Sequence, residues 1–379
     1  MAHFDTLPTL LPPPAPGFPA ARIKQQPEDF IVEELPLYEP CGSGTHTYLW
    51  IEKRGINTHD AVRRLAAVIG KRGADAGVGG LKDAVAVTRQ WISFEHVKEN
   101  RDALAAYATP ELKVLALTAH GNKLKMGHLR GNRFTITLRL ADDMPDADEA
   151  RNALLERAKF VCAQLKVLGV PNYYGTQRFG RGEQNAALGR MLVRGDRDGF
   201  QRAFNESHGA ARPPDRKLRN LLVNAFQSEL FNRVLALRLS EMGRLLPGDL
   251  ACLHRNGAVF AVNTAEDAAR EQPRADALEI SPSGPLFGPQ MPNPTQRPLE
   301  VEAQVLAESG VTASDFGRRE AESQPGARRS LRTVLMEDPL IESVSGGVLM
   351  KFALPSGSYA SVVLREVLGN ASGENTAAL

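Results

Sequence analysis

Residues 79–91 read GGLKDAVAVTRQW, and we take this stretch as the centre of the chain. Two glycines open it, and glycine allows backbone torsions that other residues resist. Valine, threonine and Trp91 follow, a composition typical of a half-buried strand. Asp83 stands between the glycines and this strand. A loop that runs into a rigid strand is a good place for a catalytic side chain, although most carboxylates in turns only hydrogen-bond their own backbone.

Length and composition indicate a globular protein of two domains. The chain has 379 residues, more than one domain usually holds, and 42% of them are hydrophobic and 24% charged. No apolar run reaches the roughly 20 residues that a membrane span needs, and the N-terminus does not resemble a signal peptide. We therefore expect no membrane partner.

The cysteines and histidines give no sign of a disulfide framework or a metal site. The three cysteines are far apart and odd in number, which fits reduced thiols and a cytoplasmic location. No two of them have the spacing of metal ligands, and the eight histidines do not cluster. We therefore expect no metal and no cofactor. The oligomeric state is not indicated, and a monomer is our expectation.

Hydrophobic periodicity predicts both strands and helices. Strands are expected to begin near residue 30 and to cover residues 47–53 and 135–138, in addition to the stretch above. Helices are expected from a cap at Thr58 to residue 69, over residues 146–168, and over residues 215–242. Asn256-Gly257 predicts a hairpin turn within residues 252–262, and the proline-rich residues 282–298 predict a loop.

Two local segments are basic although the net charge is only +2. Residues 121–133 contain lysine and arginine and no acidic residue, and residues 178–219 carry ten basic against five acidic side chains, a net +5. Such segments are usually only solvated surface, but they also suit a nucleic-acid backbone. Any nucleic-acid partner has to be inferred from these segments.

Six motifs resemble those of the TruD family of tRNA pseudouridine synthases, and they occur in the family's order. The stretch that contains Asp83 is similar to the family's catalytic motif. The others are PEDF (27–30), KLKMGHLRGNRF (123–134), VPNYYGTQRFG (170–180), NAFQSELFN (224–232) and FALPSGSYAS (352–361). Ser361 stands where the family commonly has threonine, a mild difference. The resemblance covers about residues 22–368.

The resemblance implies an α+β fold, in which a catalytic domain with an antiparallel sheet is interrupted by an inserted α/β domain, the TRUD domain. We expect a flexible proline-rich arm over residues 1–20. The catalytic domain would cover residues 21–168 and return over 326–368, with the inserted domain over 169–325 and a disordered tail over 369–379.

The family resemblance also implies an activity, the isomerisation of a tRNA uridine at position thirteen to pseudouridine. Asp83 falls on the position of the family's nucleophile, and Lys24 on that of its basic partner. A nearby cation favours the ionised form of a carboxylate. Lys82 is the adjacent alternative, but neighbours in an extended loop point in opposite directions, so we do not assign it.

Four further residues fall on the family's substrate-contact positions. Phe30, Phe134 and Phe352 could stack on a flipped uracil, and the amide of Asn132 could hydrogen-bond its edge. Core packing is the commoner role of phenylalanine. Other pseudouridine synthase families have a tyrosine where this chain has Phe134, so this residue cannot accept the C5 proton.

Three other functions are compatible with parts of the sequence. A nucleotide-phosphate enzyme is favoured by the glycines before Lys82, but the Gly-Lys-Ser/Thr sequence of a P-loop is missing. A non-catalytic RNA-binding module would use the basic segments and would not need Asp83. An RNA N-glycosylase would use the same carboxylate and release free uracil.

Overall fold

The computed structural model describes residues 4–97, 99–141, 147–208, 214–318 and 325–369. The chain divides into two compact units. We call residues Ala15–Cys162 with Leu335–Gly357 the sheet unit. We call residues Met1–Pro14, Ala163–Val334 and Ser358–Leu379 the helical unit.

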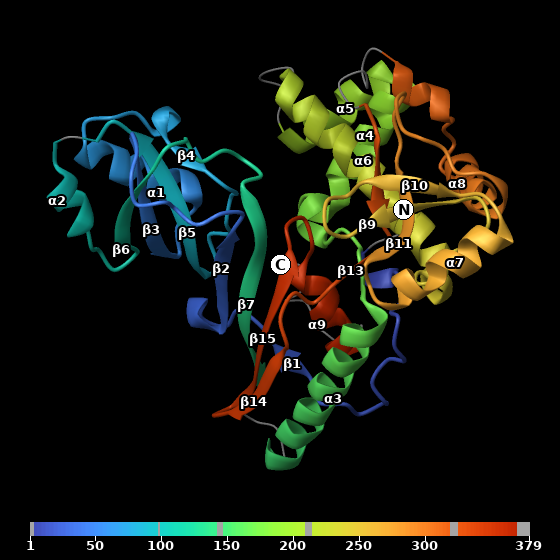
Figure 1. Ribbon diagram of the computed structural model, residues 1–379, viewed down its shortest axis with the longest axis horizontal. Coiled ribbons are helices and arrows are strands. Elements are labelled where there is room, and N and C mark those ends of the chain that lie inside the picture. The colour runs from blue at the N-terminus through green and yellow to red at the C-terminus, as the bar shows by residue number, and fades with distance from the viewer. Residues whose placement is uncertain (1–3, 98, 142–146, 209–213, 319–324, 370–379) are drawn as a thin grey trace. The chain divides into compact units, whose positions relative to one another are not determined.

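One mixed sheet forms the sheet unit, with its main strands in the order β14-β15-β7-β2-β5-β3-β6 (Figure 1). Strands β2 and β5 run parallel, whereas every other pairing between described strands of this sheet is antiparallel. The described strands are β1 (Ala21–Arg22), β2 (Phe30–Pro36), β3 (His46–Arg54), β4 (Gly77–Val78), β5 (Val87–Glu95), β6 (Leu112–His120), β7 (Leu129–Leu140), β14 (Leu340–Val344) and β15 (Gly347–Pro355). The predicted α+β class with a mainly antiparallel sheet is therefore confirmed.

Helix α1 (Thr58–Val68) covers part of one face of this sheet (Figure 1). Its Leu65 packs in one buried cluster with Leu49 of β3 and Ile92 of β5. The cap of α1 is Asn57, whose side chain accepts a hydrogen bond from the N–H of Asp60, and not Thr58 as predicted. The Thr58 side chain is buried, and its hydroxyl hydrogen-bonds to the backbone of Lys82 and to the side chain of Gln90. Helix α2 (Arg101–Ala105) is the other described helix that lies wholly in this unit.

The helical unit combines a helix cluster with a small antiparallel sheet of order β10-β9-β11-β12. Helix α3 (Ala147–Leu168) runs across the boundary between the units, and Asp146, its predicted first residue, lies outside the described residues. The other helices are α4 (Gln184–Arg194), α5 (Arg197–His208), α6 (Arg216–Leu237), α7 (Ala265–Asp276), α8 (Gln296–Glu308) and α9 (Ala360–Leu368). The strands are β8 (Val170–Pro171), β9 (Asp249–Leu253), β10 (Val259–Val262), β11 (Ile280–Leu286), β12 (Ala327–Ser330) and β13 (Arg332–Thr333).

Short 3-10 helices complete the described structure in both units. They cover Phe4–Thr6, Pro27–Asp29, Gly73–Asp75, Thr176–Arg178, Arg181–Glu183, Leu239–Glu241 and Ala313–Gly317. Among the described residues, none of the helices combines the length and the apolar character of a membrane span.

Two predictions in the helical unit need correction. The long helix ends at Leu237, because Arg238 turns out of it and binds Asp249 through both carboxylate oxygens. The predicted loop over 282–298 is a strand up to Leu286. This strand tolerates its prolines because it pairs with β9 only as far as Pro282 and with β12 only from Ser283.

Residues 4–14 of the N-terminal arm belong to the helical unit and are bound to it, whereas a flexible arm was expected. Phe4, Leu7 and Leu11 are buried. Arg365 of α9 donates hydrogen bonds to three carbonyls of the arm, and Glu366 accepts from two of its N–H groups. The arm is therefore anchored by apolar side chains before and among its prolines, which the proline content did not suggest.

The boundaries of the units differ from those predicted. Only residues 335–357 return to the sheet unit, as β14 and β15. Residues 326–334 cluster with the helical unit because β12 pairs with β11 and β13 with β8. Helix α9 belongs there too, with the arm that it binds.

We expect Leu7→Ala to lower the free energy of unfolding of the helical unit by about 2–4 kcal/mol, because it empties a buried apolar site. Far-UV circular dichroism during chemical unfolding measures this change. Both tryptophans, Trp50 and Trp91, lie in strands of the sheet unit, so their fluorescence should report a smaller effect. A loss below about 0.5 kcal/mol, the usual effect of a surface substitution, would mean that the arm is flexible after all.

Candidate active site

Asp83 lies in the loop between β4 and β5, which covers residues 79–86. The strand that follows starts at Val87, so this loop is longer than the sequence suggested. The Asp83 side chain is 47% exposed. It is therefore a carboxylate that a substrate can reach, at the end of a strand buried in the sheet.

Gly79 of this loop is needed for space and not for torsion. Neither Gly79 nor Gly80 has a positive φ. A Cβ atom at Gly79 would lie 3.1 Å from Oε1 of Glu34 and 3.2 Å from the carbonyl oxygen of His128. Gly79 thus allows the loop to pass close to strand β2 and to the segment before β7.

Lys24 is the cation beside Asp83. Its Nζ lies 3.8 Å from Oδ2 of Asp83, and its side chain is only 4% exposed. The same Nζ lies 4.5 Å from the centre of the Phe30 ring, a cation–π contact. Burial lowers the pKa of Lys24, and the Asp83 carboxylate opposes that shift. The charge of Lys24 is therefore held in a largely closed site by one carboxylate and one aromatic face.

The backbone at Lys24 is strained. Its φ is +55°, in the left-handed region that side chains with a Cβ atom avoid. Strained residues of this kind concentrate at functional sites, where surrounding contacts hold them. This strain is an independent reason to place Lys24 in the site.

Lys82 points away from Asp83 and belongs to a second ion pair. Its Nζ lies 3.2 Å from Oε2 of Glu34, with both side chains buried. Burial raises the pKa of Glu34, and Lys82 acts against that rise. The opposite directions of the adjacent side chains are those expected for an extended loop.

The three predicted phenylalanines form one aromatic cluster. The rings of Phe30 and Phe134 are 6.2 Å apart and edge to face, and those of Phe134 and Phe352 are 5.6 Å apart. Phe134 of β7 lies directly opposite Phe352 of β15 and Val32 of β2, so these side chains share one face of the sheet. All three rings are buried, as core packing would also predict.

Asn132 lies on the same face, two residues before Phe134 on β7. It is directly opposite Glu34 on β2 and Leu354 on β15. Its Oδ1 is buried and has no hydrogen-bond partner among the described residues. A buried acceptor without a donor is costly, so a ligand that supplies the donor would be favoured here.

Sequence reasoning missed three side chains that bind the backbone of the Asp83 loop. Lys53, Thr58 and Gln90 come from β3, α1 and β5, and all are buried. One signal was available for Lys53: it follows Leu49 and Ile51 in alternation, at a position where the strand's inward pattern calls for an apolar residue. For Thr58, the role of helix cap was the more obvious reading.

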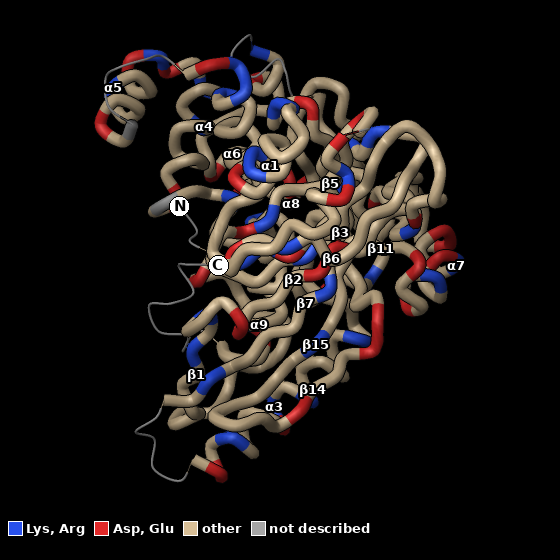
Figure 2. The backbone as a smooth tube through the Cα atoms, turned by 90° about the vertical axis from the view of Figure 1, so that its left-hand side faces the viewer, with Lys and Arg blue, Asp and Glu red and all other residues tan. Residues whose placement is uncertain are grey.

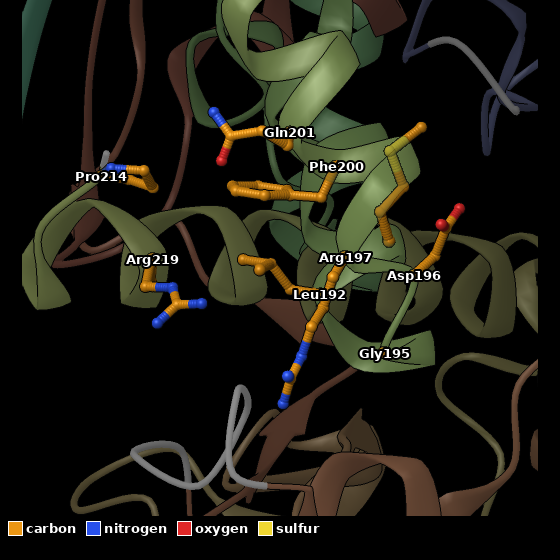
Figure 3. A pocket seen from close by; sticks show the side chains of 9 residues that line it. Leu192, Gly195, Asp196, Arg197, Phe200, Gln201, Pro214 and Arg219 are labelled. Carbon is orange, nitrogen blue, oxygen red and sulfur yellow. The ribbon is translucent and has the colours of Figure 1, made fainter. Parts of the chain in front are cut away.

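A pocket of about 240 Å³ in the helical unit is a second place where a ligand could bind (Figure 3). Its lining includes two guanidinium groups and the ring of Phe200. The carboxylate among its residues, Asp196, accepts a hydrogen bond from the N–H of Gly199 at 2.9 Å. The pocket contains none of the predicted site residues, so we place the candidate active site at Asp83. Its lining residues are Met191, Leu192, Gly195, Asp196, Arg197, Phe200, Gln201, Pro214 and Arg219.

Comparison with known proteins finds one family. The family described as tRNA pseudouridine synthase D (TruD) matches residues 16–215 and 200–367. A tRNA pseudouridine synthase D of Anaeromyxobacter dehalogenans (strain 2CP-C) is 42% identical, over 91% of this chain and 92% of that protein. The protein of the same name from Geobacter metallireducens is 37% identical, over 91% of this chain and 94% of that protein.

A solved structure shares the fold. The crystal structure of a Methanosarcina mazei protein, named as a tRNA pseudouridine synthase D, superimposes with a TM-score of 0.72. It covers 96% of this chain and 94% of its own, at 24% identity. From the match over most of the sequence, we conclude that this chain belongs to the tRNA pseudouridine synthase D (TruD) family.

Proposed function

We propose that the protein isomerises one uridine of tRNA, at position thirteen, to pseudouridine, and that Asp83 is the nucleophile. The observation that carries the proposal is an accessible carboxylate beside a buried ammonium, Nζ to Oδ2 3.8 Å, in a chain of this family. An ionised carboxylate suits a group that must add to the substrate and leave again.

The reaction is an internal rearrangement of the nucleotide. The bond from N1 of uracil to C1′ of ribose breaks, a bond from C5 to C1′ forms, the C5 proton leaves and N1 gains a proton. Nothing is oxidised, reduced or lost, so the reaction requires no cofactor. The Asp83 carboxylate can serve by attack on C1′, by attack on C6, or as a base that forms a glycal intermediate. Each of these routes uses its ionised form.

Lys24 places a positive charge beside that carboxylate and fixes its direction. The Lys24 side chain is buried, so its ammonium is directed at Asp83 and not at solvent. The cation–π contact with Phe30 in turn holds the ammonium in place.

The uracil would be held by the aromatic cluster and by Asn132. The base must leave the RNA stack to be reached, and enzymes commonly hold such a base between apolar and aromatic side chains. Phe30 and Phe134 would form the wall nearest to the Lys24–Asp83 pair, with Phe352 packed behind Phe134. The unpartnered Oδ1 of Asn132 would accept the N3–H of uracil.

The basic segments would bind the tRNA backbone, but not through every residue. Basic and acidic positions are interspersed along the chain (Figure 2), in line with its net charge of +2. Arg133 is engaged by the carboxylates of Glu33 and Glu337, so its charge is already compensated. Lys125 and Arg130 are exposed in the same segment. We place the protein in the cytoplasm, as a monomer that acts on free tRNA.

The wild-type protein, incubated with tRNA alone, should produce pseudouridine at one position without a change of mass. Asp83→Asn should abolish turnover and keep tRNA affinity, because the amide has nearly the same shape and is a far poorer nucleophile. Chemical mapping measures the pseudouridine formed by each variant, mass spectrometry measures the mass of the tRNA, and a binding titration measures the affinity for tRNA. Asp102→Asn, at an exposed aspartate of α2, is the matched control and should remain active.

Two outcomes would contradict this assignment. Release of free uracil would identify an N-glycosylase, and turnover by Asp83→Asn within tenfold of wild type would remove Asp83 as nucleophile. Binding of tRNA without any modification would identify an RNA-binding module.

Lys24→Met should lower the single-turnover rate at saturating tRNA. The substitution keeps the aliphatic stem and deletes the ammonium that lies 3.8 Å from the Asp83 carboxylate and fixes its direction. Lys24→Arg, which keeps a charge, should lose less of the rate. A rate of Lys24→Met equal to that of wild type would show that Lys24 does not act on Asp83.

Affinity for tRNA should fall steeply with salt. If about five phosphates are neutralised, the slope of log K against log salt is roughly −4. Lys125→Ala should reduce its magnitude by about one. Lys159→Ala, at an exposed lysine paired with Glu156, is the control and should leave the slope unchanged. A flat dependence for the wild type would mean that the basic segments are only solvated surface.

A further inference from the structure

We propose that Lys53 is a positioning residue for the reaction: its amino group fixes the backbone of Asp83 and so determines where the catalytic carboxylate stands. This inference rests on the proposed role of Asp83. Lys53 is 0% exposed, so it cannot touch the tRNA itself and acts only through the residues that it binds.

Lys53 stands near the end of β3, opposite Thr88 of β5. Its side chain lies on the face that carries Leu49 and Ile51, under helix α1. An apolar residue would satisfy this position by packing alone. A buried amino group there needs partners to be tolerated.

The partners of Lys53 are two backbone carbonyls in different loops. Its Nζ donates to the carbonyl oxygen of Asp83 at 2.5 Å and to that of Ile56 at 2.8 Å. Ile56 lies in the turn between β3 and α1, and Asp83 in the loop before β5. One side chain therefore ties the catalytic loop to the frame of the sheet unit.

Burial of this amino group costs free energy, because its charged form is removed from water. Burial lowers the pKa of Lys53 to about 8; the nearby Asp83 carboxylate acts in the opposite direction, and Lys82 in the same one. Either protonation state keeps at least two N–H donors, which is the number that the two carbonyls need. The contacts thus suit a structural clamp that does not depend on the charge of Lys53.

Two other side chains bind the same loop. The Oγ1 of Thr58 accepts a hydrogen bond from the N–H of Lys82 at 2.9 Å. The Nε2 of Gln90 donates to the carbonyl of Gly80 at 3.1 Å, and Oε1 of Gln90 accepts from Thr58 at 3.0 Å. The backbone is therefore held at residues 80, 82 and 83, and Lys53 is the side chain that holds the catalytic residue itself.

This clamp matters because the Asp83 side chain is half exposed. Water surrounds much of the carboxylate, and its ion pair with Lys24 is 3.8 Å long. The position of the carboxylate relative to a bound base then depends mainly on the position of the Asp83 backbone. A displacement of about 1 Å at a reacting group can lower a rate by about a hundredfold.

The test compares Lys53→Met with Leu104→Ala in the full-length protein. Methionine keeps most of the side-chain volume and removes both donors. Leu104 is a fully buried residue of α2 in the hydrophobic cluster that contains Leu49 and Ile51. It does not belong to the catalytic loop. Each variant is assayed well below its thermal midpoint, for the single-turnover rate at saturating tRNA and for the dissociation constant of tRNA.

Lys53→Met should lose about a hundredfold in the single-turnover rate, with a dissociation constant within threefold of wild type. Leu104→Ala should keep its rate within threefold although it too is destabilised. A rate for Lys53→Met within threefold of wild type, or equal losses of rate in the two variants, would overturn the proposal.

A second variant covers the case in which Lys53→Met does not fold. Lys53→Gln keeps an N–H donor on a chain that is one atom shorter, so the bond to Asp83 is lost or the loop is displaced. Its single-turnover rate should fall at least tenfold, and a rate equal to that of wild type would overturn the proposal.

Hydrogen exchange separates this inference from the proposed function. Amide exchange in residues 79–86 should become faster in the folded Lys53 variant than in wild type and Leu104→Ala. If the wild type forms no pseudouridine, the proposed function fails whatever the exchange shows. If the wild type is active and exchange in this loop is unchanged, the role of Lys53 fails alone.

Discussion

The structure of the site depends on one asymmetric ion pair, a buried ammonium at Lys24 and an exposed carboxylate at Asp83. A buried charge requires a partner, whereas a half-exposed carboxylate in water does not. Lys24 is therefore the member that needs the pair, and the fold supplies its surroundings: the turn after β1, the ring of Phe30 and the loop after β4. The nine-stranded sheet brings these segments together because β7 pairs with both β1 and β2, and β5 pairs with β4.

Three buried amino groups lie around the Asp83 loop, and each has a defined partner. Lys24 pairs with Asp83, Lys82 pairs with Glu34, and Lys53 binds backbone carbonyls. These arrangements are not interchangeable. The first leaves its carboxylate open to solvent, the second closes both partners, and the third uses no side-chain acceptor. Only the first therefore presents a charged group to a substrate, although all three lysines lie around the same loop.

The sequence was informative where chemistry lies in a motif and uninformative where it depends on tertiary contacts. Asp83, Lys24 and Phe30 could be proposed as site residues because motif positions carry over to this chain, and the structure brings the three together. Lys82 could be set aside because adjacent side chains diverge. The fold class followed from the family resemblance, and periodicity predicted three of the nine described α-helices, α1, α3 and α6. Thr58 and Gln90 were not recognised, because their partners are backbone atoms that no motif identifies. The one signal for Lys53, a charged residue in an apolar alternation, did not reveal that its partner is the backbone of Asp83. The anchoring of the arm was missed because its prolines drew more attention than its three buried apolar residues. The role of Leu7 can be seen only in the folded chain, where Arg365 of α9 binds its carbonyl oxygen.

The left-handed backbone of Lys24 has an evolutionary consequence. At φ +55°, glycine or asparagine would fit with less strain, and a side chain without charge would avoid desolvation. The residue that the proposed chemistry needs is thus among the least suitable for the fold at this position. Selection for heat resistance alone, in a laboratory library or in a lineage that no longer uses the enzyme, would replace Lys24 early. Retention of lysine at position 24 in a diverged relative would accordingly be a sign that selection still acts on catalysis.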